Sequence, residues 1–135
     1  MRGCRWTASV AVRRWIFLAY WFTMFAGTHT PRLEIIRPEV FRIPHADKVI
    51  HFCMFAGWMS LCWWLLRSPR GRPGRRAVTG AFLAGALYAA FDELTQSLVG
   101  RDTSFGDFLA DIAGMLAALW VLEAWHRRQT SRKTA

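Results

Sequence analysis

Four long apolar stretches constrain the fold of this chain more than any other feature. They cover residues 15–30, 49–66, 77–91 and 105–125. A helix that crosses a hydrocarbon core of ~30 Å needs about 20 residues, with a lower limit of about 17. The third stretch reaches this length only if Asp92 and Glu93 enter the outer part of the membrane. We therefore predict an all-α membrane protein with four transmembrane helices at about 12–30, 48–66, 77–98 and 105–125, in one domain over residues 1–135.

The first stretch has a second interpretation, because four arginines precede a short apolar core, as in a signal peptide. Cleavage after Ala26 or Gly27 would place Met24 or Phe25 where a small residue is needed. The unusually aromatic core also favours a retained helix over a cleaved one.

The charged residues are divided between the two ends of the predicted helices. Segments 1–14, 67–76 and 123–135 together hold thirteen Lys and Arg against one acid, whereas segments 31–48 and 92–111 hold five against eight acids. Cytoplasmic segments of membrane proteins carry the excess of Lys and Arg. The pattern predicts a multi-pass protein of the inner (plasma) membrane with both termini cytoplasmic and membrane lipids as partners.

Composition excludes several other classes. The net charge of +9 would suit a nucleic-acid binder, but the eight Trp and ten Phe lie in uncharged stretches rather than between basic residues, so no nucleic-acid partner is predicted. Cys53 and Cys62 are nine residues apart and are interpreted as small buried hydrophobic residues. The tryptophans at 58, 63, 64, 120 and 125 are expected to face lipid or its interface.

Polar residues that a bilayer would exclude form three groups, which the predicted topology places at the extracytoplasmic face. The groups are Asp47, Lys48 and His51; Asp92, Glu93 and Gln96; and Arg101, Asp107 and Asp111. At ~1.5 Å per residue, Asp92 and Asp111 both lie about 8 to 9 Å below the outer boundary. A charged side chain at the centre of a bilayer costs about 2.5 to 3.5 kcal/mol and less near its edge. Several charges at one level must therefore share partners.

Some of these residues also have a purely structural interpretation. Asp47 would be favoured at the positive end of its helix, and Lys48 could extend to the lipid headgroups. Ser104 and Asp107 match a Ser-x-x-Asp helix-capping pattern. His51 follows Asp47 by four residues, so that Asp47 is predicted to orient its imidazole.

Asp92 and Glu93 lack such an explanation, because the helix dipole disfavours acids at a C-terminal end. Two adjacent carboxylates in a low dielectric also resist ionising together, so we expect them to share a proton or to face a cation such as Arg101 or Lys48. Small residues at four-residue intervals predict the close helix packing that brings these carboxylates together. They are Ala81, Gly85 and Ala89, and Gly114 and Ala118.

Three motifs follow one another along residues 44–118. They are Asp47-Lys48-x-x-His51-Phe52-x-x-Phe55, then Tyr88-x-x-x-Asp92-Glu93-x-x-Gln96, and then Arg101 followed by Asp107-x-x-x-Asp111-x-x-Gly114. In order and spacing this part of the chain resembles the VanZ-like family of small membrane proteins, whereas the first helix contributes no motif. The family is named for a member associated with resistance to teicoplanin, a glycopeptide antibiotic that acts on cell-wall precursors outside the membrane. No settled enzymatic activity attaches to it.

The resemblance implies a site made of the motif residues. They are Asp47, Lys48, His51, Tyr88, Asp92, Glu93, Gln96, Arg101, Asp107 and Asp111. Two positions depart from the family pattern: residue 111 is often Asn and is Asp here, and residue 118 is often Gly and is Ala here. The first departure adds a negative charge to the site.

Two functions remain open at this point. In the first, the polar residues bind or alter a lipid-linked envelope precursor or headgroup, with His51, Asp92 and Glu93 as the catalytic acid/base groups and Lys48 and Arg101 holding a phosphate. In the second, the ionic residues lock the helices together and offer a binding surface without catalysis. Carboxylates and one histidine could hold a hard cation or zinc, but no HExxH or comparable spacing is present, so we predict no metal and no cofactor.

Overall fold

The computed structural model describes residues 9–30, 45–67, 72–100 and 103–134. All regular elements in these ranges are helical, which confirms the predicted all-α class for the described residues. The elements are α1 (Val10–Thr28), α4 (Ala46–Leu66), α5 (Arg75–Gln96), the 3-10 turn η1 (Ser97–Val99) and α6 (Phe105–Thr134).

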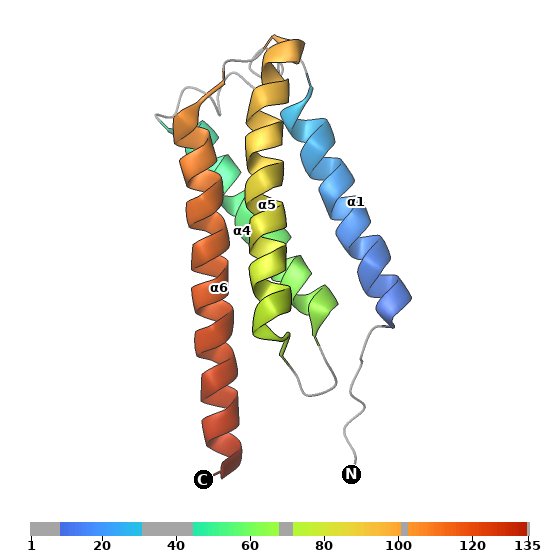
Figure 1. The fold of residues 1–135 in the computed structure, drawn as a ribbon, viewed down its shortest axis with the longest axis vertical. Coiled ribbons are helices and arrows are strands. Elements are labelled where there is room, and N and C mark those ends of the chain that lie inside the picture. Colours follow the sequence, from blue (N-terminus) through green and yellow to red (C-terminus); the bar gives the residue numbers. More distant parts are fainter. Residues whose placement is uncertain (1–8, 31–44, 68–71, 101–102, 135) are drawn as a thin grey trace.

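The four long helices run alternately up and down, so that successive helices are antiparallel (Figure 1). α4 lies centrally and packs against α1, α5 and α6, most extensively against α6. The C-terminal ends of α1 and α5 and the N-terminal ends of α4 and α6 meet at the upper end of Figure 1. The topology therefore gathers Thr28, Ala46, Gln96 and Phe105 at one end of the bundle.

Three helices in the described part of the chain are long and apolar enough to cross a membrane: α4, α5 and the part of α6 from Phe105 to Arg132. α1 falls outside this group, although its 19 residues extend about 28 Å at 1.5 Å per residue. The structure thus supports a membrane protein with three apolar helices of spanning length. A fourth span by α1 stays a prediction.

α6 differs most from its predicted bounds, because it continues from the expected end near residue 125 to Thr134. Its 30 residues extend about 45 Å, which exceeds a hydrocarbon core of ~30 Å by several turns. The added turns contain Arg127, Arg128 and Arg132. A helix that continues into water satisfies its own backbone hydrogen bonds, so the end of an apolar stretch does not have to end the helix.

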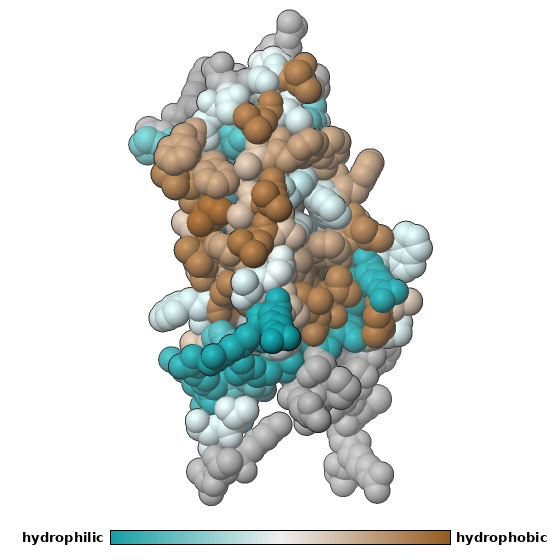
Figure 2. Space-filling model, in the orientation of Figure 1, coloured by the Kyte–Doolittle hydropathy of each residue, from teal (hydrophilic) through white to brown (hydrophobic). Residues whose placement is uncertain are grey.

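The surface of the bundle is apolar where a soluble protein would be polar. Figure 2 shows a band of hydrophobic side chains across the middle of the visible face, with hydrophilic side chains gathered at its lower end. Phe22, Leu87, Leu94 and Trp120 are between 68% and 74% exposed. Exposed apolar surface of this extent is typical of contact with lipid or with another protein.

The interior is centred on α4, and this position overturns the predictions for two tryptophans. Trp58 was expected to face lipid and Trp63 the membrane interface, but both are buried, because α4 packs against three other helices. Trp120 and Trp125 on α6 are exposed, as predicted. Cys62 is buried as predicted, but Cys53 is exposed, so its interpretation as a buried residue was wrong.

The predicted small residues do allow close helix contacts. A Cβ atom added at Gly114 would collide with the backbone carbonyl oxygen of Phe52, so α6 and α4 touch backbone to backbone at this point. A Cβ at Gly85 would lie 2.5 Å from the sulfur of Met115 and 2.7 Å from the ring of Trp58, so side chains of α6 and α4 occupy the space left by that glycine. These contacts position α4, α5 and α6 close enough for their polar side chains to meet.

Candidate functional site

The polar residues predicted from the sequence gather at the end of the bundle where Thr28 and Gln96 lie (Figure 1). Seven polar side chains at this end belong to the most buried class in the structure. They are Thr28, His51, Asp92, Glu93, Gln96, Asp107 and Asp111. With His29, Asp47 and Lys48 we call them the polar cluster. Arg101, which was predicted to hold a phosphate, lies outside the described residues.

His51, Glu93 and Asp111 form the centre of the cluster, and we call them the triad. They come from α4, α5 and α6 respectively and are 3%, 4% and 0% exposed. Nδ1 of His51 is 3.0 Å from Oδ1 of Asp111 and 3.7 Å from Oε1 of Glu93. One imidazole nitrogen therefore faces two carboxylates from two other helices.

Glu93 also fixes the start of α6. Its second oxygen, Oε2, accepts a hydrogen bond of 2.9 Å from the backbone N–H of Ser104. The hydroxyl of Ser104 in turn accepts a bond of 3.3 Å from the N–H of Asp107, which is the capping contact that the Ser-x-x-Asp pattern predicts. Because Glu93 satisfies the Ser104 N–H, the carboxylate of Asp107 is free for another partner.

That partner is Lys48. Its Nζ donates to Oδ1 of Asp107 at 2.9 Å and to Oδ2 of Asp47 at 3.0 Å, and so joins α4 to α6. Gly106 leaves room for the lysine, since a Cβ there would lie 3.0 Å from its Cε. The predicted orientation of His51 by Asp47 is not found, because the hydrogen-bond partner of His51 is Asp111. A residue in the facing helix lies closer to the imidazole than one a turn away on its own helix.

Asp92 points away from the triad and toward α1. Its Oδ1 accepts a hydrogen bond of 2.8 Å from Thr28 and lies 3.5 Å from the hydroxyl of Tyr88, while Oδ2 accepts 2.8 Å from Gln96. Nδ1 of His29 is 3.6 Å from the same carboxylate. The adjacent acids Asp92 and Glu93 thus have separate partners, and Lys48 contacts neither of them.

Thr28 and His29 are members of the cluster that the sequence motifs missed. The first helix was expected to contribute no motif, yet both of these residues approach Asp92. The available signal was their position: they end an apolar stretch at the level predicted for the other polar groups. A threonine and a histidine at a helix end are common, so position alone did not identify them.

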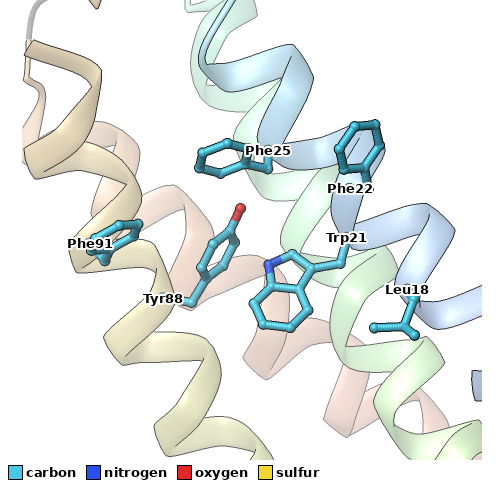
Figure 3. Close-up of a pocket in the computed structure, with 6 residues that line it drawn as sticks. All are labelled: Leu18, Trp21, Phe22, Phe25, Tyr88 and Phe91. Carbon is cyan, nitrogen blue, oxygen red and sulfur yellow. The ribbon is translucent and has the colours of Figure 1, made fainter. Parts of the chain in front are cut away.

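An apolar pocket opens beside this part of the cluster, between α1 and α5 (Figure 3). It has a volume of about 590 Å³ and is lined by Leu18, Trp21, Phe22, Phe25, Tyr88 and Phe91. Tyr88 connects the pocket to the polar cluster, because its ring packs edge-on against Trp21 while its hydroxyl lies 3.5 Å from Asp92 of the cluster. A ligand whose apolar part occupied the pocket would therefore have its other end close to the polar cluster.

The cluster carries more negative than positive charge. Five carboxylates, those of Asp47, Asp92, Glu93, Asp107 and Asp111, are accompanied by one lysine and two histidines among the described residues. The ligand atoms of His51, Glu93 and Asp111 all lie within 4.8 Å of one another, so that these three side chains could hold a metal ion. The arrangement can bind a cation or a hydrogen-bond donor, and it can exchange a proton through His51.

Comparison with known proteins supports the resemblance noted in the sequence. The family model of VanZ/LLP1 matches residues 5–126, which extends well beyond the three motifs and includes α1. Neither the comparison with curated proteins nor that with solved structures gave a match. The family match covers most of the chain, and this protein therefore belongs to the VanZ/LLP1 family.

Proposed function

We propose that this protein crosses the inner (plasma) membrane four times and uses the polar cluster to bind, or to act on, a component of the cell envelope. The observation that carries the proposal is the triad, three ionisable side chains from three helices buried at one end of a membrane bundle. Ionisable residues inside membrane segments are costly, and they commonly mark functional sites.

α1 is the fourth span in this proposal. It packs against α4 and α5, and its apolar residues Trp15 and Phe22 are 72% and 74% exposed, which suits contact with lipid. Arg13 near its start donates a hydrogen bond of 2.9 Å to the carbonyl oxygen of Trp64 at the far end of α4. α1 therefore runs alongside α4 over nearly the full height of the bundle.

The distribution of basic residues supports an extracytoplasmic position for the cluster. The opposite end of the bundle holds Arg72, Arg127 and Arg132, in the segments with the excess of Lys and Arg. A cysteine introduced at Ser131 should react with a membrane-impermeant thiol reagent only after the membrane is opened, in a background where Cys4, Cys53 and Cys62 are serine. Labelling in intact cells would show that the orientation is the opposite of the one proposed.

The ligand is proposed to be a lipid-linked precursor or headgroup with an apolar chain and a polar end. The apolar pocket of about 590 Å³ and the cluster meet at Tyr88, which would suit such a molecule. The family resemblance adds glycopeptide antibiotics such as teicoplanin to the phenotypes worth testing.

A survival assay tests this function. Cells that carry the wild-type protein, Glu93→Gln or His51→Asn are compared across envelope-directed antibiotics that include teicoplanin, and the membrane level of each protein is measured. We expect the wild-type phenotype to be lost in both variants at unchanged protein level. Glu123→Gln and His126→Asn, at the opposite end of the bundle, are the matched controls and should behave as wild type.

A non-enzymatic role in helix packing or partner binding is the second candidate function. It is favoured by the fact that the bonds of Asp92 with Thr28, of Lys48 with Asp107 and of His51 with Asp111 each join two helices. Under this function the phenotype would fall in proportion to the amount of folded protein in the membrane. The parallel measurement of protein level separates the two.

A further inference from the structure

The spacing of the triad atoms matches the first coordination shell of a small metal ion. Two ligands at about 2.0 to 2.1 Å from a tetrahedral zinc ion lie about 3.3 Å apart. Nδ1 of His51 is 3.0 Å from Oδ1 of Asp111 and 3.7 Å from Oε1 of Glu93, so the observed separations lie on either side of that value. The three ligand atoms come from three helices and all lie within 4.8 Å of one another.

The carboxylates of the triad have acceptor capacity that the described residues do not use. Oε1 of Glu93 and Oδ2 of Asp111 are buried and have no hydrogen-bond partner there. The two side chains are 5% and 0% exposed, so that bulk water does not solvate them. Buried carboxylate oxygens are normally satisfied by hydrogen bonds, by a counter-charge or by a metal ion.

The charge of the triad also favours a bound cation. Two carboxylates face one imidazole, and the nearby Lys48 is already bonded to Asp47 and Asp107. The other neighbouring acid, Asp92, is turned toward Thr28 and Gln96. A cation placed between Glu93 and Asp111 would balance two carboxylates whose one basic neighbour among the described residues is the imidazole of His51.

We propose that His51, Glu93 and Asp111 form a binding site for one divalent transition-metal ion, with Zn²⁺ as the best fit. Ca²⁺ takes six to eight oxygen ligands, and Mg²⁺ demands an octahedral oxygen shell, whereas an imidazole with two carboxylates suits zinc. Three protein ligands leave the fourth tetrahedral position open, which is the arrangement of catalytic rather than structural zinc sites.

The surroundings of the triad would support such a site. The backbone N–H of Ser104 holds Oε2 of Glu93 at 2.9 Å and leaves Oε1 directed at His51. Groups of this kind orient metal ligands, and their loss typically weakens metal binding by about 10- to 100-fold. Binding of a metal ion by the triad requires the protein alone, so this proposal does not depend on the identity of an envelope ligand.

Metal binding is measured on the full-length protein, purified in detergent with a tag that contains no histidine and stripped of metal by chelation. Zn²⁺ is titrated by calorimetry, and bound zinc is counted by elemental analysis after dialysis. We expect one Zn²⁺ per chain, together with a melting temperature that rises with Zn²⁺ concentration, because a ligand that binds the folded state stabilises it. Co²⁺ in place of Zn²⁺ should give the visible absorption of a four-coordinate site.

His51→Asn, Glu93→Gln and Asp111→Asn should each weaken Zn²⁺ binding by about 100-fold or more, since loss of an outer contact alone costs about 10- to 100-fold. His126→Asn and Glu123→Gln are the matched controls, and a variant in which Cys4, Cys53 and Cys62 are all serine excludes thiolate binding. Less than one Zn²⁺ bound by the folded wild type would overturn the proposal, whether or not the variants fold. Equal binding by wild type and triad variants would do the same.

Discussion

Gly114→Ala tests whether the close contact of α4 and α6 holds the polar cluster together. A Cβ at this position would collide with the carbonyl oxygen of Phe52 and lie 3.0 Å from its carbonyl carbon and 3.1 Å from the nitrogen of Ala56. An ordinary contact needs at least 3.4 Å, so the 3.0 Å contact with the carbonyl carbon alone requires a local separation of about 0.4 Å, and the collision with the carbonyl oxygen requires more. The obstacle is backbone of a packed helix, which cannot rotate aside as a flexible side chain can.

The expected cost of this substitution is about 1 to 3 kcal/mol, the usual range for an overpacked core. The same separation would lengthen the 3.0 Å contact of His51 with Asp111. His51 directly precedes Phe52 on α4, and Asp111 lies about one turn before Gly114 on α6. Stability is measured by denaturation in detergent micelles. Gly80→Ala is the control, since nothing lies within 4 Å of its added Cβ and alanine favours a helix.

Equal stabilities of Gly114→Ala and Gly80→Ala, within about 0.5 kcal/mol, would refute the reasoning. They would mean that α4 and α6 are farther apart than the contact of Gly114 with Phe52 requires, and the triad could not then be assembled as described.

Two further substitutions test single contacts of the polar cluster. Thr28→Val removes the 2.8 Å hydrogen bond to the buried Asp92 and should cost about 1 to 3 kcal/mol, while Thr23→Val, whose hydroxyl bonds only within its own helix, should cost clearly less in the same denaturation assay. Asp107→Asn weakens the ion pair with Lys48, whose side chain is 36% exposed against 11% for that of Asp107. Because Lys48 keeps its bond to Asp47, the loss should be less than about 1 kcal/mol and should shrink as salt is added; a large, salt-independent loss would show that Asp107 has a different role.

The sequence predicted the helical class and the end of the bundle at which the polar residues meet. Both follow from local information, because the length of an apolar stretch and the rise per residue set the level of every side chain in a membrane helix. Asp92 and Asp111 were in this way expected at one level, and the structure brings Asp111 to His51 together with Glu93, the neighbour of Asp92. The motif spacing was likewise enough to suggest the family that the match over residues 5–126 then showed.

The partners of each side chain could not be predicted in the same way. Asp47 was expected to orient His51 because the two are one turn apart, yet the rotation of α4 against α6 gives that contact to Asp111. The burial of Trp58 and the part played by Thr28 also depend on which helix lies next to which. Local spacing carries no information about neighbours that are 60 or more residues away.

The sequence by itself therefore determined a membrane-embedded helical chain with acids, a lysine and a histidine near one boundary, since lipid excludes polar groups from an apolar stretch and leaves them at its ends. Only the tertiary structure decided that His51, Glu93 and Asp111 form one buried triad. The reason is geometric: each helix contributes a single ligand, and the angle at which it faces its neighbours arises from packing at residues such as Gly114 and Gly85, not from the spacing of the ligands along the chain.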